Sequence, residues 1–323
     1  MNEQQQTLLD FMRQQSGKLL EQTIQHIGLT FISLFIAVLI GLPLGIFISR
    51  KKQFSGAVLG LAGILQTIPS IALLGFMIPV LGIGPKPAIA ALLLYALLPI
   101  IRNTFTGITG VDAAVKEAAV AMGMSKRQIL FKVEFPLAMP VIFAGIRTAT
   151  VITVGVATLA SYIAAGGLGE FIFGGISLNN TNMILAGAIP AALLAILFDF
   201  LLSRLQRINI KKMKAVTIML PLLLILFSSF YFIPAAYATK LKAGFTPEFM
   251  GRRDGNLGLQ SRYGLKISTV VISDAVMYKA LYQKQLDVIS GYSTDGRLKA
   301  YGLVVLKDDK RIFPPYYAAP IVR

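Results

Sequence analysis

The side chains that could carry chemistry are unevenly distributed along this chain of 323 residues. The sequence has no cysteine and a single histidine, His26, which excludes disulfides, thiolate metal sites and catalytic centres built on paired histidines. Seven of the eleven tyrosines lie in the last 84 residues. Tyrosine ring faces attract cations, including quaternary ammonium groups, which have no hydrogen to donate. The C-terminal tail is therefore a candidate for binding such a cation.

Packing is the alternative role for these aromatic side chains. Four of them are spaced as expected for the buried faces of amphipathic elements: Tyr263, Tyr278, Tyr282 and Tyr301. For these four we expect a structural role.

A second group of residues has the spacing of a contact site for another protein. The segment 112–122 is rich in alanine, which favours a short helix with a surface of small side chains. Gly123 then permits a sharp change of direction, and Pro136 is expected to end the helix that follows. The residues of this segment that matter here are Glu117, Ala118, Ala119, Gly123, Val133, Phe135 and Pro136. Such a knob can pack into a groove of a partner, and the alternative is an interfacial amphipathic helix without a partner.

The sequence has no nucleotide-binding motif of its own. No Gly-x-x-x-x-Gly-Lys-Ser/Thr sequence occurs in it, so it lacks the P-loop that cradles the phosphates of ATP. Any ATP-driven process that involves this chain must take its energy from another subunit.

The elements that position these residues are mostly membrane spans. Hydrophobic residues make up 55% of the chain and charged residues only 14%, whereas a soluble domain has about 25% charged residues. A helix needs about 20 apolar residues to cross a bilayer. The expected spans are 28–49, 56–81, 88–101, 138–162, 183–203 and 216–236. Pro69 and Pro79 predict a kink or break in the second, and the third is short unless it continues past Arg102.

The basic residues predict the orientation of the spans. Thirteen lysines and arginines lie in the segments 50–52, 102–132 and 204–214, on one face of the expected bundle, against three on the other. Cytoplasmic loops have such an excess. The N-terminal segment 1–27 and the chain after residue 238 are then extracytoplasmic. With the basic residues divided in this way, and no basic stripe, we expect no nucleic-acid partner despite the net charge of +16.

Two ionisable residues lie in or near the expected membrane interior. Arg147 falls within the fourth span, which suggests a place on a transport pathway or a pair with another helix, for which Asp199 is near the same face. Snorkelling is an equal alternative for Arg147. Glu170 lies in the segment 165–175, which is too rich in glycine for a regular helix and is expected to re-enter the membrane or form an outer gate. A solvated loop carboxylate is the favoured interpretation of Glu170.

The composition changes at Thr239, and the segment 239–323 is expected to be a soluble, extracytoplasmic α/β unit. Residues 269–273 and 287–292 predict strands. Asp274 can cap a helix between them that continues to residue 285.

The segment 216–238 is either a sixth span or a signal-like anchor. Basic residues, an apolar core and Ala236-Tyr237-Ala238 follow one another in the order of a secretory signal peptide. An uncleaved anchor is favoured because the apolar run is longer than the roughly 7 to 15 residues of a signal peptide.

The alanine-rich loop resembles the EAA loop of ATP-binding-cassette importer permeases. Its sequence EAAVAMG, followed after nine residues by VEFP, has the family's spacing, with Val133 and Phe135 in place of isoleucine and leucine. The resemblance implies a coupling helix that sits in a cleft of a cytoplasmic ATPase subunit, where Glu117 makes polar contacts. It also implies a second permease copy, identical or different. ATP and magnesium would be bound by the partner ATPase, and no cofactor by this chain.

The tail resembles the second lobe of the glycine betaine, carnitine and choline binding proteins of osmoprotectant importers. The sequences YSTDGR from Tyr292 and FPPYYAAP from Phe313 carry this resemblance. It implies that Tyr292 and Tyr316 belong to an aromatic ligand cage, with Thr294 and Asp295 in the adjacent loop. Tyr292 also falls at the carboxyl end of its expected strand, where open α/β sheets bind ligands. The first lobe of that family is expected to be missing, which would leave half a cage and weak binding.

Together these features predict an α-helical integral membrane protein with a MetI-like importer permease core of about six spans. The expected parts are an N-terminal segment 1–27, the permease domain 28–215 with its coupling loop 112–136, the anchor 216–238, and the partial binding domain 239–323. The expected function is uptake of quaternary ammonium solutes, which a separate binding protein would deliver if the tail is inactive. The alternative is a membrane-anchored binding or osmotic-sensing protein without transport. No enzymatic activity is expected in this chain.

Overall fold

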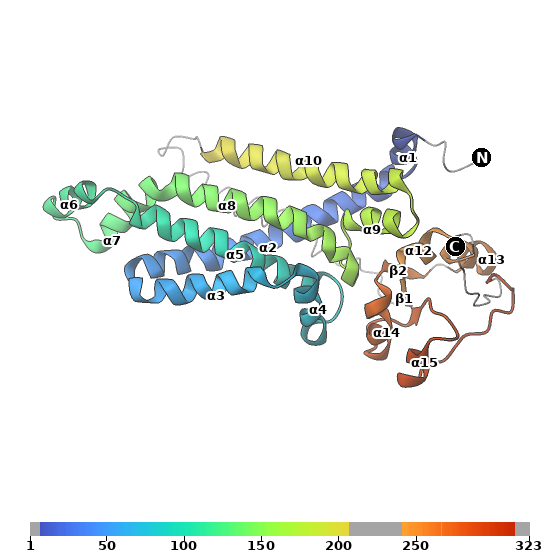
Figure 1. Ribbon diagram of the computed structural model, residues 1–323. Helices are drawn as coiled ribbons and strands as arrows, with labels where there is room; N and C mark the ends of the chain where they lie inside the picture. Colours follow the sequence, from blue (N-terminus) through green and yellow to red (C-terminus); the bar gives the residue numbers. More distant parts are fainter. Residues whose placement is uncertain (1–6, 207–240, 253, 266, 314–323) are drawn as a thin grey trace, which may run out of the picture.

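The computed structural model describes residues 7–206, 241–252, 254–265 and 267–313. A long helical bundle and a small α/β unit make up these residues, and the α/β unit lies at the end of the bundle opposite to α6 and α7 (Figure 1). The expected sixth span, the Ala236-Tyr237-Ala238 site and Tyr316 lie outside the described residues.

The bundle contains both membrane-length helices and short ones. The helices up to residue 109 are α1 (Leu8–Gln14), α2 (Ser16–Arg50), the 3₁₀ turn η2 (Lys52–Phe54), α3 (Ser55–Thr67), α4 (Ser70–Leu81) and α5 (Pro85–Thr109). They are followed by α6 (Ala113–Ala121), α7 (Lys126–Ile129), η3 (Leu130–Glu134), α8 (Phe135–Ala157), η4 (Thr158–Ile163), α9 (Gly169–Ser177) and α10 (Thr181–Gln206).

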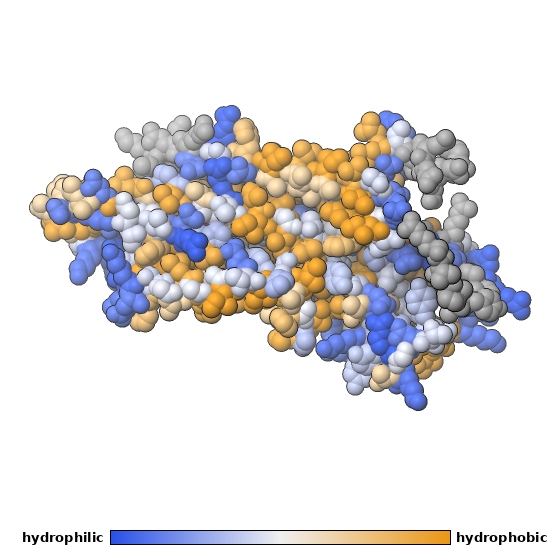
Figure 2. All heavy atoms as spheres, viewed as in Figure 1, coloured by the Kyte–Doolittle hydropathy of each residue, from blue (hydrophilic) through white to orange (hydrophobic). Residues whose placement is uncertain are grey.

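Four continuous helical segments are long and apolar enough to cross a membrane: Ser16–Arg50, Pro85–Thr109, Lys126–Ile163 and Thr181–Arg204. The pair Lys52–Thr67 and Ser70–Leu81 passes the same test only when taken together, and its bend of 97° fits either a broken span or a re-entrant loop. Five of the six expected spans are thereby located, and the third continues past Arg102 to Thr109. Hydrophobic side chains form a broad band over the visible face of the bundle (Figure 2).

The break in the second span lies at Pro69, as expected. The residue before a proline is driven into an extended conformation, and Ile68 has a ψ of 127°, which ends α3. The Tyr95 hydroxyl donates a hydrogen bond to the carbonyl oxygen of Ile68. This bond satisfies a backbone group at the bend, where no regular helix partner exists.

The centre of the bundle is α5, which packs between α2 and α8. Close approach depends on small residues, because helices in a membrane associate by packing rather than by exclusion of water. A Cβ atom on Gly145 of α8 would lie 2.7 Å from the carbonyl oxygen of Pro99 in α5. Buried side chains from all three helices, including Leu34, Ile100 and Ile142, form one cluster around this contact.

The prediction that Pro136 ends a helix is wrong. Pro136 is the second residue of α8, and the chain runs helically from Lys126 through η3 into α8. Proline has no N–H and its ring clashes with the carbonyl group four residues earlier, which here is Lys132. The five residues Leu130–Glu134 are a π-helix, whose wider turn accommodates this clash without interrupting the helix.

The prediction that the segment 165–175 is too glycine-rich for a helix is also wrong in part. Ala164, Gly166 and Gly167 have positive φ values and form a turn, but a regular helix, α9, begins at Gly169. Tertiary packing outweighs the low helix propensity of glycine here. Gly187 of α10 approaches so closely that a Cβ on it would lie 2.7 Å from the carbonyl oxygen of Leu168.

The α/β unit has a three-stranded parallel sheet of order β2-β1-β3. Its elements are β1 (Lys242–Phe245), α12 (Pro247–Gly251), α13 (Asn256–Tyr263), β2 (Ser268–Val271), α14 (Asp274–Tyr282), β3 (Val288–Ile289) and α15 (Gly296–Ala300). The expected strand, helix and strand are confirmed, with shorter bounds. Ser273 rather than Asp274 caps α14, since the Ser273 side chain accepts a hydrogen bond from the N–H of Ala275.

Candidate functional site

The alanine-rich loop forms a projecting tip made of α6 and α7 at one end of the bundle (Figure 1). Asp112 caps α6 by accepting a hydrogen bond from the N–H of Ala114 at 2.9 Å. Glu117 and Ala118 are exposed, whereas Ala119 is buried. Gly123 follows α6 with a φ of +73°, a conformation that favours glycine. The sharp turn expected at Gly123 is therefore present.

Large apolar side chains are exposed on the tip and next to it. Val115, Val120 and Met122 are exposed on the tip, and Phe131 is exposed in the adjoining π-helix. Together with the exposed Glu117 and Ala118 they give the tip the small-residue and apolar surface that suits a protein groove.

An ion pair with a buried carboxylate joins the π-helix that follows the tip to the end of α2. Glu134, the last residue of the π-helix, is only 3% exposed, and both of its carboxylate oxygens accept hydrogen bonds from Arg50 at the end of α2. A buried carboxylate requires such a partner. Sequence reasoning missed this pair. The available signal was an acidic residue between Val133 and Phe135, with an arginine at the end of another span on the same face.

Arg147 is paired rather than isolated. Its guanidinium donates two hydrogen bonds of 2.9 Å to the two carboxylate oxygens of Asp199 on α10. It donates a third, of 3.1 Å, to Gln206. The expected pairing with Asp199 is confirmed, and the contact links α8 to α10. A role of Arg147 on the transport pathway stays a prediction.

Glu170 is not the solvated loop carboxylate that the sequence favoured. It lies in the first turn of α9, its side chain is 11% exposed, and Lys18 of α2 lies 3.7 Å from one carboxylate oxygen. The pairing arises because the Lys18 side chain of α2 reaches Glu170 and the ring of Phe171 on α9, which the glycine content of the segment did not indicate. A role as a gate residue stays a prediction.

The tail places two of its expected ligand residues at one edge of the sheet. Tyr292 follows β3, with 54% of its surface exposed, and Thr294 is exposed in the same loop. Asp295 caps α15 by accepting a hydrogen bond of 2.9 Å from the N–H of Arg297. Tyr316, the other expected cage residue, lies outside the described residues.

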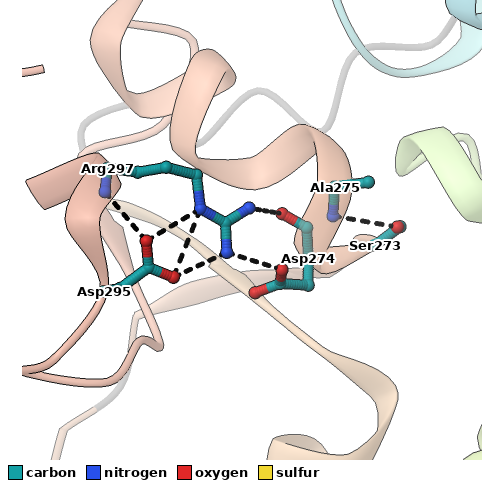
Figure 3. Close-up of polar contacts among 5 residues, drawn as sticks. All are labelled: Ser273, Asp274, Ala275, Asp295 and Arg297. Carbon is teal, nitrogen blue, oxygen red and sulfur yellow. Dashed lines mark hydrogen bonds and ion pairs between the residues drawn. The ribbon is translucent and has the colours of Figure 1, made fainter. Parts of the chain in front are cut away.

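Arg297 organises this loop (Figure 3). Its guanidinium donates to the carboxylates of both Asp295 and Asp274, at 2.6 and 2.7 Å, and lies 3.9 Å from the ring centroid of Tyr278. These hydrogen bonds hold the pKa of Asp295 well below its usual range. Asp295 therefore shapes the loop next to Tyr292 through contacts within the chain. A direct contact of Asp295 or Thr294 with ligand stays a prediction.

The four tyrosines expected to have packing roles make internal contacts. Tyr278 is buried in the core of the unit. Tyr282 lies 5.1 Å from Tyr301, ring centroid to ring centroid, and the Tyr263 hydroxyl bonds to Asp308 at 3.1 Å. The packing role is confirmed for Tyr278, whereas Tyr282 makes its ring contact on the surface, with 59% of its area exposed.

Residues 37–215 match the family described as the binding-protein-dependent transport system inner membrane component. The chain belongs to this family. The permease also resembles curated proteins of several bacteria. It is 44% identical to the choline transport system permease protein OpuBB of Bacillus subtilis (strain 168) over 200 residues, which cover 62% of this chain and 92% of that protein. It is 46% identical to the osmoprotectant import permease protein OsmW of Salmonella typhimurium over 203 residues, covering 61% of this chain and 94% of that protein.

Solved structures of importers share the fold of the permease. An inward-facing structure of the MetNI methionine ABC transporter is similar with a TM-score of 0.54 and 26% identity, covering 58% of this chain and 95% of that one. The tail matches a second family, described as the substrate binding domain of an ABC-type glycine betaine transport system, over residues 234–323. The permease is thus a transport component rather than an enzyme. Its membrane part matches the inner membrane component of such importers, and its tail matches their substrate binding domain.

Proposed function

We propose that this permease is the membrane-spanning subunit of an ATP-binding-cassette importer for quaternary ammonium solutes, namely glycine betaine, carnitine and choline. The observation that carries the proposal is the agreement between the two parts of the chain. Relatives of the membrane part are named as choline, carnitine and glycine betaine permeases, and the tail independently matches a glycine betaine binding domain.

The tip formed by α6 and α7 is the proposed contact for the ATPase subunit. Its exposed apolar side chains and the turn at Gly123 fit a groove on a partner. The pair of Arg50 and Glu134 ties the π-helix that follows the tip to α2, so a movement of the tip is passed on to both α8 and α2. ATP and magnesium are bound by the partner. A second permease copy completes the transport path, and a separate binding protein delivers the solute if the tail is inactive.

The α/β unit is proposed to be extracytoplasmic. It contacts the end of the bundle opposite to the tip, as Figure 1 shows. If the tip contacts a cytoplasmic ATPase, the α/β unit faces the side from which the solute arrives. The excess of basic residues near the tip supports the same orientation.

The test is uptake of labelled choline, carnitine and glycine betaine in cells that lack their own importers and express the permease with an ATPase subunit. We expect uptake that requires ATP hydrolysis. Glu117→Ala is expected to weaken it, and Gly123→Val to abolish both uptake and co-purification with the ATPase. Solute binding without uptake, with the ATPase bound, would contradict a transport function.

Gly123→Asn is the matched control for this experiment. Apart from the residues next to Gly123, no atom lies within 4 Å of a Cβ built on it, so a Cβ there fits without a clash. Asparagine tolerates positive φ, whereas valine does not, so the two variants separate backbone strain from bulk at the interface. Loss of ATPase binding in both variants indicates a tight interface at Gly123, and loss in valine alone indicates that the turn is what matters.

A further inference from the structure

A cavity of about 220 Å³ lies between the α/β unit and the bundle. One wall belongs to the α/β unit and includes Thr246, Glu248 and Ser273. The other belongs to the permease and includes Tyr162, Glu170 and Phe173. At about 30 Å³ for each water of the bulk liquid, the space is equivalent to roughly seven waters, which suits a small solute.

The first wall is the edge of the sheet at which α/β domains bind ligands. The strands β1 and β2 are parallel and end at Phe245 and Val271, so the residues that follow them meet at one edge. Thr246 and Ser273 are those residues, and each caps the helix that comes next. Open parallel sheets bind ligands outside the carboxyl ends of their strands. The cavity therefore lies at the edge of the sheet where such domains bind ligands.

Hydrogen bonds between the two parts fix the second wall in place. The N–H of Ser273 donates to the carbonyl oxygen of Tyr162 at 3.2 Å. The N–H of Ile83, in the turn between α4 and α5, donates to the side-chain oxygen of Gln285 at 2.8 Å. Ile83 and Ala164 also pack against the apolar core of the α/β unit. The end of the permease is therefore in direct contact with the α/β unit and forms one side of the cavity.

The side chains in the cavity suit a quaternary ammonium group. Tyr162 and Phe173 lie edge to face with ring centroids 6.1 Å apart, and both line the space. Aromatic rings attract a cation that has no hydrogen to donate, most strongly where water is excluded.

The carboxylates of the cavity are balanced by neighbouring cations. Lys18 lies 3.7 Å from Glu170, Arg252 lies 3.7 Å from Glu248, and Arg297 lies 2.7 Å from Asp274, the third carboxylate of the lining. At these separations each carboxylate still attracts the positively charged group of a solute. The neighbouring cations reduce the repulsion between the carboxylates and a negatively charged group on the same solute. Choline and the zwitterions glycine betaine and carnitine are all compatible with this charge distribution.

We propose that this composite cavity binds the quaternary ammonium group of the solute, with the sheet edge as one wall and the outer end of the permease as the other. The proposal rests on the proposed function for its solute class. It places the solute in contact with the permease while it is still held by the α/β unit. Tyr162 and Phe173, which no comparison assigns to ligand, are then binding residues.

Equilibrium binding of labelled choline to the full chain in lipid nanodiscs, without an ATPase, tests this site. Tetramethylammonium, which has the quaternary group alone, is the competitor. Tyr162→Leu and Phe173→Leu are each expected to weaken binding about 5- to 30-fold, the range that corresponds to about 1 to 2 kcal/mol for a cation–π contact. Tyr282→Leu is the matched control, since this exposed tyrosine does not line the cavity.

Protection of an introduced thiol provides a second measurement, which reports where the solute binds. The chain has no native cysteine, and Ser177 lines the cavity at an exposed position of α9. A thiol reagent is expected to modify the Ser177→Cys variant, and choline to slow this modification by the fraction of sites it occupies. Ile176→Cys, which is exposed on the same helix but does not line the cavity, should show no protection.

The outcomes separate this inference from the proposed function. Weaker choline binding in both ring variants, together with protection of residue 177, supports the composite site. Binding that is unchanged in both ring variants overturns it. Uptake with a separate binding protein and no choline binding to the chain alone also overturns it, while the importer function stands. Normal binding with no uptake leaves the composite site in place and contradicts the importer function.

Discussion

At the scale of single residues, the two members of the ion pair between Arg50 and Glu134 should differ in how much their removal destabilises the permease. Glu134 is almost fully buried, whereas 41% of the Arg50 side chain is exposed. Removal of Arg50 leaves a buried carboxylate without its partner, and removal of Glu134 leaves a cation that can still reach water. An uncompensated buried charge is far more destabilising than an unpaired exposed one.

We therefore predict that Arg50→Ala destabilises the permease more than Glu134→Gln does, by about 1 to 3 kcal/mol. Thermal unfolding in detergent, followed by circular dichroism because the chain has no tryptophan, measures the difference. Arg50→Lys is the conservative control, and the double variant should recover part of the loss from Arg50→Ala. Equal destabilisation by the two single changes would contradict the asymmetry.

Single residues also mark the limit of sequence-based prediction here. The pair of Arg147 and Asp199 was predictable because both charges lie in apolar spans near the same membrane face. The partner of Glu134 and the burial of Glu170 were not, because both depend on packing between helices far apart in sequence. Hydropathy indicates that a segment is buried in a membrane, but it does not indicate which neighbour satisfies a charge.

At the scale of elements, the bend between α3 and α4 depends on one side chain from another helix. Tyr95 of α5 donates to the carbonyl oxygen that the break at Pro69 frees. We predict that Tyr95→Phe destabilises the fold by about 1 to 3 kcal/mol, since it leaves this carbonyl group without a donor. Thermal unfolding by circular dichroism checks this. Tyr282→Phe, an identical change at an exposed site, should have little effect, and equal effects would exclude this role of Tyr95.

The elements themselves were largely predictable. Runs of apolar residues located the four continuous membrane-length helices and the bent pair α3 and α4, and proline located the break in that pair. Helix propensity failed at α9, where packing against α10 overrides the glycines, and at Pro136, where the π-helix accommodates a proline that was expected to end a helix. Both failures arise where tertiary contacts, rather than local preferences, decide the conformation.

At the scale of the whole molecule, the contact between the α/β unit and the bundle joins segments about 200 residues apart in sequence. Because the chain lacks cysteine, a pair of introduced thiols reports on this contact without background. We predict that Ile83→Cys and Gln285→Cys are joined efficiently by a short bismaleimide reagent in membranes. Leu257→Cys, exposed on α13, should not be joined to residue 83. Comparable yields for the two pairs would show that the docked arrangement is not maintained.

The composite cavity could not be predicted from the sequence. Its walls come from residues 161–177 and 246–274, and neither segment alone has the spacing of a binding motif. The sequence predicted an aromatic contribution to binding from Tyr292, which follows the third strand of the same sheet. It gave no reason to add Tyr162 and Phe173, because their proximity to the sheet arises only from the docking of the two parts.

The π-helix Leu130–Glu134 also fixes the rotational phase between the tip and the span that follows it. A regular α-helix turns by about 100° for each residue, so deletion of one residue from this segment would restore a regular helix and rotate α7 about α8 by roughly that angle. The tip and the span would each keep their own structure, while the face presented to the partner would change. A single inserted residue thus sets the direction in which the tip faces.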